Sequence, residues 1–98
     1  MLSESNTSVK LAEFLLKIKA VKLQPKQPFK WSSGWNSPIY CDNRVTLSYP
    51  EIRSFIKHQM AAAIRSEFPQ ATALCGVATA GIAIGGLVAD ELEMPYSY

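Results

Sequence analysis

Residues 76 to 81, GVATAG, form the segment of this 98-residue chain that is best suited to binding an anion. A short apolar run precedes this segment, and a helix-like run, TAGIAIGGLVADELEM, follows it. The free N–H groups and the dipole at the start of a helix attract anions, and Gly76 and Gly81 leave room for phosphate oxygens near the backbone. The segment has neither a Walker loop nor G-x-G-x-x-G spacing. Close packing of the two glycines against a sheet explains them equally well.

Residues 29 to 44, FKWSSGWNSPIYCDNR, concentrate aromatic and polar groups in a second segment. We expect two short strands around SSGWNS, because Gly34 and Asn36 tolerate the positive φ of tight turns. Tyr40, Val45 and Thr46 suit a pleated surface. Trp31 and Trp35 are explained most simply by ordinary packing within this hairpin.

Other reactive side chains are isolated. Cys41 and Cys75 lack CxxC spacing, so two buried thiols are expected rather than a disulfide. The single histidine, His58, falls on a predicted helix at a solvated position, which argues against zinc. Lys26 and Lys30 are also expected to be solvated.

The elements that must position these residues follow from periodicity. Residues 8–23 read as an amphipathic helix capped by Ser5, Thr7 or Ser8. Ser48, Pro50 and Glu51 form a capping-box signature for a second helix, which closes at Pro69. The expected apolar stripe of that helix is Ile52, Phe55, Ile56, Met60, Ala63 and Ile64.

The remaining chain predicts a parallel α/β unit. The run 71–77 suits a strand buried on both faces, 79–94 a helix, and MPYSY the start of the next strand. Strand, helix and strand in this order form a βαβ unit with a parallel sheet.

Composition excludes several classes of protein. With 48% hydrophobic and 18% charged residues, the chain is one globular domain or part of one. A net charge of +2 is too small to predict nucleic-acid or membrane binding. No secretory signal is recognisable, so we predict a cytoplasmic location. The longest apolar run, within AGIAIGGLVA, is far shorter than the ~20 residues of a membrane span.

Together the segments resemble the orotate phosphoribosyltransferases of the pyrimidine pathway. The resemblance rests on an S-G-x-x-S-P-x-Y-x-D pattern followed by a capped helix, G-x-A-x-x-G and PYSY, and it runs from about Phe14 to Tyr98. It implies an α/β fold of the type I phosphoribosyltransferases, truncated: an N-terminal helix and hairpin hood, then the first βαβ unit of the parallel sheet. We expect a single partial domain, 1–98, with helix and hood in 1–47 and the start of the α/β core in 48–98.

The resemblance also implies site residues. The hood would cover the orotate ring, and the ATAG loop would contact the pyrophosphate of phosphoribosyl pyrophosphate. Some members carry a lysine where this chain has Ser32, and Tyr-Lys where it has Thr79-Ala80. The positive charge near both substrates is therefore weaker here. The implied residues are Ser32, Tyr40 and Cys41 for orotate, and Thr79, Ala80 and Gly81 for pyrophosphate.

The implied activity forms orotidine 5′-phosphate and pyrophosphate, for UMP synthesis, in a Mg²⁺-dependent homodimer. The family's closing loop and 5′-phosphate loop lie beyond Tyr98. We therefore expect no catalytic or metal-binding residue in this chain, and no turnover by the 98 residues alone.

Three alternatives remain open: another phosphoribosyltransferase, a non-catalytic nucleobase- or nucleotide-binding module, and a structural subunit. Asp42 and Arg44, two apart on an expected strand, either pair at the surface or support the hood.

Overall fold

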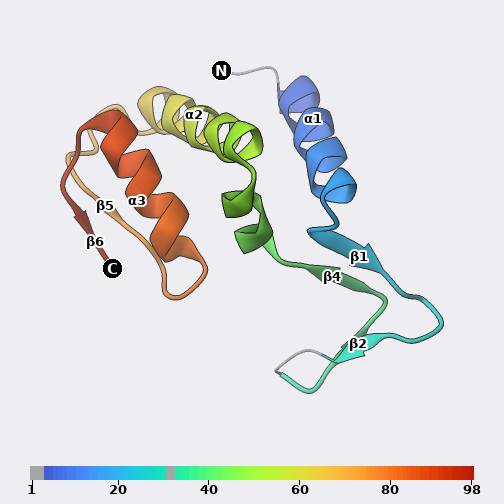
Figure 1. Cartoon of the computed structure of the whole chain (residues 1–98). Coiled ribbons are helices and arrows are strands. Elements are labelled where there is room, and N and C mark those ends of the chain that lie inside the picture. Colours follow the sequence, from blue (N-terminus) through green and yellow to red (C-terminus); the bar gives the residue numbers. More distant parts are fainter. Residues whose placement is uncertain (1–3, 31–32) are drawn as a thin grey trace.

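The structure is a computed structural model that describes residues 4–30 and 33–98. It is elongated, at 46 × 29 × 23 Å, with a radius of gyration of 15.1 Å, whereas a compact domain of this length has about 13 Å. Figure 1 shows the strands that follow α1 projecting away from α2 and α3. The elements are α1 (Glu4–Lys17), β1 (Val21–Leu23), β2 (Phe29–Lys30), β3 (Asn36–Ser37), β4 (Ile39–Cys41), the 3₁₀ helix η1 (Asn43–Ser48), α2 (Pro50–Glu67), β5 (Leu74–Cys75), α3 (Gly81–Leu92) and β6 (Tyr96–Ser97).

The predicted βαβ unit is confirmed at the C-terminal end. β5 and β6 pair in parallel, with Leu74 opposite Tyr96 and Cys75 opposite Ser97, and α3 connects them. Leu74 is half-buried and Cys75 is exposed, so the prediction of a strand buried on both faces is wrong. In the described chain this sheet has only two short strands, and they do not enclose Cys75.

Most of the buried apolar side chains of the described residues lie on α2 and α3. They are Ile52 and Ala61 from α2, and Val88 and Ala89 from α3. The predicted α2 stripe is confirmed at Ile52 and, as half-buried residues, at Phe55, Ile56 and Ile64; Met60 and Ala63 are exposed instead. Ala61 is fully buried because a small side chain lets the two helices approach closely.

The N-terminal half contains two antiparallel pairs. β2 pairs with β3, which confirms a hairpin in this segment. Its second strand, Asn36–Ser37, lies within SSGWNS rather than after it, so the prediction of Asn36 as a turn residue is wrong, whereas Gly34 has the expected positive φ, at 94°. β1 pairs with β4 over three residue pairs, from Val21 opposite Cys41 to Leu23 opposite Ile39. We call residues 21–41 the hood segment.

The predicted first helix is wrong at both ends. α1 begins at Glu4, so the three proposed cap residues lie inside it. It ends at Lys17, and Lys19 has φ 61°, in the left-handed region, which turns the chain out of the helix. Ala20 is buried, and its carbonyl accepts a hydrogen bond from the Asp42 N–H at 2.8 Å. The predicted end of the helix therefore forms β1.

The predicted capping box is also wrong. Ser48 belongs to η1, and Tyr49 occupies the N-cap of α2 without a side-chain cap. Pro50 does begin the helix, and Glu67 ends it before Pro69, as expected. Val45 and Thr46 lie in η1 rather than in a strand, because Asp42 caps this turn and the Thr46 hydroxyl donates to the Asn43 carbonyl at 2.6 Å.

Candidate functional site

The GVATAG segment forms the exposed connection between β5 and α3. Thr79 and Ala80 are exposed and Gly81 is half-buried. Ala80 precedes the helix without a side-chain cap, and the Gly81 N–H donates to the Val77 carbonyl at 2.8 Å. Thus the three predicted residues lie together at the carboxyl end of β5, where ligands gather in α/β sheets.

Gly76 has a packing role. Its N–H donates to the Ser97 carbonyl at 2.9 Å, which completes the β5–β6 ladder. A Cβ placed on Gly76 would collide with the Tyr96 hydroxyl, which donates to the Ile82 carbonyl at 2.6 Å. At Gly81 the nearest atom to such a Cβ is the Val77 Cβ at 3.8 Å, so space is open there. The packing explanation therefore holds for Gly76 and not for Gly81.

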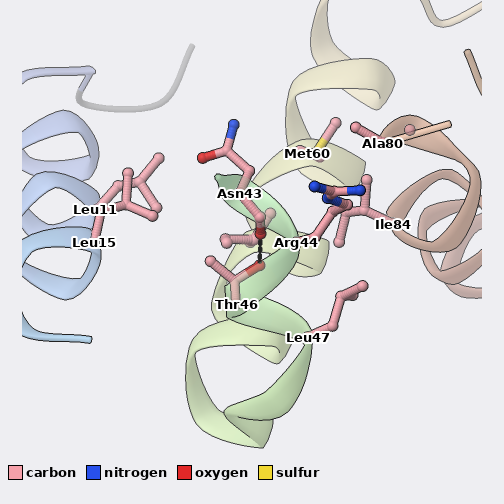
Figure 2. Close-up of a pocket in the computed structure, with 11 residues that line it drawn as sticks. Leu11, Leu15, Asn43, Arg44, Thr46, Leu47, Met60, Ala80 and Ile84 are labelled. Atoms are coloured by element: carbon pink, nitrogen blue, oxygen red, sulfur yellow. Dashed lines mark hydrogen bonds between the residues drawn. The ribbon is translucent and has the colours of Figure 1, made fainter. Parts of the chain in front are cut away.

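A pocket of about 380 Å³ opens beside this connection. Arg44 and the Ala80–Gly81 pair share it, although 36 positions separate them in the chain. Figure 2 shows the Arg44 side chain on η1 directed toward the start of α3. The pocket is lined by Leu11, Leu15, Asn43, Arg44, Thr46, Leu47, Ile56, Met60, Ala80, Gly81 and Ile84.

Asp42 holds the Arg44 guanidinium in a fork. The Arg44 Nε lies 2.9 Å from Asp42 Oδ1 and Nη2 lies 3.1 Å from Oδ2, and the Arg44 backbone N–H also donates to Oδ1 at 3.0 Å. These hydrogen bonds from Arg44 lower the pKa of Asp42. The same pairing raises the pKa of Arg44, and Tyr40 adds a smaller effect of the same sign. The predicted pair is thus confirmed, but it belongs to η1 and its cap rather than to a strand.

The predicted orotate residues lie apart from the pocket. Tyr40 and Cys41 are exposed on β4 and are not among its lining residues. The Tyr40 ring packs against Phe29 at 5.6 Å between centroids, and the Cys41 thiol lies 3.3 Å from Asn43 Oδ1. Ser32 lies outside the described residues, as does Trp31. Trp35 is 75% exposed, so hairpin packing does not explain it.

Comparison with known proteins identifies the architecture. No family model matches the chain. An orotate phosphoribosyltransferase of Bacteroides fragilis is 58% identical over 87 residues, which are 89% of this chain and 41% of that protein. The structure of Leishmania donovani UMP synthase matches with a TM-score of 0.75 and 28% identity, over 91% of this chain and 19% of that one. Orotate phosphoribosyltransferase of Aeropyrum pernix matches with a TM-score of 0.74 and 29% identity, over 88% of this chain and 50% of that one.

The chain is similar to the N-terminal part of these orotate phosphoribosyltransferases. It spans about two-fifths of the length of the curated relatives, such as 41% of the Bacteroides fragilis protein. The α/β fold inferred from the resemblance, with hood and first βαβ unit, is confirmed by the matching structures.

Arg44 lines this pocket, and the sequence analysis did not single it out for the anion-binding site. The signal that could have found it is the Asp-x-Arg spacing of Asp42 and Arg44 directly before the capped turn. That spacing was assigned to a strand, where both side chains would face one surface, and the 3₁₀ turn instead directs Arg44 toward α3.

The described residues offer no ready metal centre. No group of three or more His, Cys, Asp or Glu side chains gathers within residues 4–30 and 33–98. His58 is exposed as predicted, with its Nε2 3.4 Å from Glu91 Oε1. Both cysteines are free thiols, as predicted, but both are exposed rather than buried. No helix in the described part of the chain has the length and apolar character needed to cross a bilayer.

Proposed function

We propose that the protein containing this chain transfers ribose 5-phosphate from phosphoribosyl pyrophosphate to orotate. A bond forms between a ring nitrogen of orotate, which releases its proton to solvent, and the ribose C1. The bond from C1 to the pyrophosphate oxygen breaks, and its electron pair leaves with the pyrophosphate. The products are orotidine 5′-phosphate and pyrophosphate, on the route to UMP. The observation that carries this proposal is the exposed connection at Thr79 and Ala80, set beside a pocket that Arg44 lines, in a chain similar to orotate phosphoribosyltransferases.

We assign the two predicted groups of residues to different substrates, one group to pyrophosphate and the other to orotate. Thr79, Ala80 and Gly81 would meet the leaving pyrophosphate, because Thr79 and Ala80 are exposed and Gly81 has no side chain in the way, although its N–H is paired with the Val77 carbonyl. The hood segment would cover the orotate ring, with the backbone at Tyr40 and Cys41 and the Ser32 hydroxyl nearest to it. Such contacts accelerate transfer by positioning the reactants and stabilising the charge that develops on the leaving group.

Mg²⁺ would supply charge neutralisation for the pyrophosphate. Mg²⁺ is commonly held by substrate phosphates and few protein ligands, and the described residues provide no ligand cluster for it. We therefore assign no metal ligand within them, and none of the roles above depends on the metal.

The assembly is also part of the proposal. We propose a cytoplasmic homodimer without nucleic-acid or membrane partners, and a division into helix and hood (1–47) and the start of the α/β core (48–98). Several exposed apolar side chains, among them Leu16, Phe68 and Val77, support further association because such surfaces favour burial. Sedimentation of the protein as a monomer at tens of micromolar would contradict the dimer.

The test of the activity is a direct assay. The chain is extended at its C-terminal end by the part of the Bacteroides fragilis relative that it does not match, and orotate absorbance is followed with phosphoribosyl pyrophosphate and Mg²⁺. We expect a steady decline of absorbance. Use of uracil or hypoxanthine in place of orotate would instead indicate another phosphoribosyltransferase.

The 98 residues alone serve as the matched control in that assay. We expect no turnover from them, because each missing positioning group is typically worth ~10² to 10³ in rate. Steady turnover by the short chain would show that it holds a complete active site. Orotate binding without transfer by the extended protein would favour a non-catalytic module.

A further inference from the structure

We propose that Arg44 is a pyrophosphate-binding residue that supplies the positive charge which the Thr79–Ala80 connection lacks. This inference rests on the proposed function and names a residue of the same site. It follows from three features of the structure: the charge of Arg44, the orientation of its side chain and the size of the pocket.

Arg44 provides the charge of this pocket. Of the described residues that line it, Arg44 alone is charged. The Thr79–Ala80 pair contributes a hydroxyl and backbone groups, which leave a doubly anionic phosphate without a counter-charge. Because the 3₁₀ turn of η1 brings Arg44 to the same pocket as Ala80 and Gly81, a cation from a distant segment lies beside the uncharged connection.

Asp42 fixes which edge of the guanidinium faces outward. A guanidinium has five N–H donors in a planar fork. The Asp42 carboxylate takes the Nε and Nη2 edge, at 2.9 and 3.1 Å. This leaves the Nη1–Nη2 edge, which matches two oxygens of a phosphate in the bidentate geometry that arginine favours. Arg44 is thus held in place before any ligand binds, and Asp42 acts as a positioning residue.

Apolar side chains complete the lining of the pocket. They include Leu11 and Leu15 from α1 and Ile56 and Met60 from α2. The volume of about 380 Å³ also falls within the range of roughly 300–1,000 Å³ that is usual for small-molecule sites.

The primary test measures which substrate depends on Arg44. In the extended protein, Arg44→Gln removes the charge, and we expect the KM for phosphoribosyl pyrophosphate to rise about 10- to 100-fold. The KM for orotate should change less than about 3-fold, because orotate is assigned to the hood. Arg65→Gln removes the same charge from an exposed site on α2 outside the pocket, and both KM values should stay unchanged.

Two further variants separate charge from geometry. Arg44→Lys keeps the charge but loses the fork, so we expect an increase in the same KM of about 3- to 10-fold. Asp42→Asn keeps Arg44 but weakens its orientation, and it should raise that KM by a similar factor with little change in kcat. Asp42→Glu should recover part of the loss, whereas a purely structural role of Asp42 would affect both substrates together.

Different results would contradict this inference and the proposed function. If the extended protein transfers nothing to orotate, the function is wrong, and calorimetric titration with inorganic pyrophosphate still decides the role of Arg44. Equal pyrophosphate affinity of the wild type and Arg44→Gln would overturn the inference. So would a KM for orotate that rises as much as that for phosphoribosyl pyrophosphate. If Arg44→Gln does not fold, the same comparisons with Arg44→Lys apply.

Discussion

The two halves of the chain are stabilised in different ways. From Pro50 onward, α2 and α3 pack together and carry the buried side chains Ile52, Ala61, Val88 and Ala89. Among the described residues of the hood segment Ser37 is the buried one, and the strands are held by ladder hydrogen bonds between short antiparallel pairs. Large side chains such as Leu23 and Trp35 stay exposed there, at 63% and 75%. Figure 1 shows this segment extending away from the packed helices.

Because of this difference, the residues that stabilise the fold lie in another region than the residues that we assign to ligand contact. A packed core resists change because lost contacts and buried charges cost free energy, whereas an exposed ladder tolerates side-chain changes. The hood segment is therefore free to vary its side chains and to present its surface to a ligand. The pocket at Arg44 lies where the two halves meet, between η1 and the start of α3.

The largest effect is expected in the core. Val88→Asp would bury an unpaired charge at a residue that is 1% exposed, and it should lower the free energy of unfolding by roughly 4 kcal/mol or more. Urea unfolding followed by circular dichroism measures this change. The matched control is Val9→Asp on α1, where valine is 58% exposed and a shift within about 0.5 kcal/mol is expected. Similar losses for both variants would contradict the assignment of the core.

The next effect tests the Tyr96 contact in the βαβ unit. Gly76→Ala places a Cβ against the Tyr96 hydroxyl and 2.8 Å from the Gly81 carbonyl oxygen, so we expect a loss of about 1–3 kcal/mol. Gly86→Ala meets only the Tyr96 ring at 3.6 Å and should stabilise α3 by up to about 1 kcal/mol. Combining Gly76→Ala with Tyr96→Phe should recover part of the loss in a double-mutant cycle. No recovery would place the strain at the Gly81 carbonyl instead.

The sequence predicted the βαβ unit well because its signals are local. An apolar run, a helical run and a second strand follow one another, and each is delimited by turn residues. The split of residues 8–23 was not predictable, because Val21 and Leu23 continue the apolar pattern and the left-handed turn falls on Lys19 rather than on glycine. The resemblance singles out Thr79 to Gly81, and their role in binding stays a prediction. The position of Arg44 beside Ala80 was not predictable, because it depends on how η1 packs between the helices.

A smaller effect is expected in the hood segment. Trp35→Ala should change the free energy of unfolding by less than about 0.5 kcal/mol, because this side chain is 75% exposed. Phe29→Ala in the same hairpin is the contrasting variant. It removes the ring that packs on Tyr40 at 5.6 Å, and such aromatic pairs are worth about 0.5–1.5 kcal/mol. A larger loss from Trp35→Ala than from Phe29→Ala would mean that the hood segment has a core of its own.

The smallest effect concerns the ion pair where the two halves meet. Hydrogen bonds from Arg44 lower the pKa of Asp42 below its usual 3.8, and the nearby charge of Lys22 contributes least. A carboxylate whose pKa is lower in the folded state binds protons more weakly there, so its stabilising contribution is present above pH 3.8 and is lost as the pH falls through the lower folded value. The pair is exposed, so the change in overall stability should be small.

The sharper measurement is the Asp42 carboxyl resonance by NMR, titrated from pH 6 to pH 2. We expect its midpoint to lie below 3.8 and to return toward 3.8 in Arg44→Gln, while Arg65→Gln leaves it in place because Arg65 lies near Glu91 instead. An Asp42 midpoint that is the same in the wild type and in Arg44→Gln would show that the paired hydrogen bonds do not persist in solution. Asp42 would then not explain the orientation of Arg44 toward the pocket.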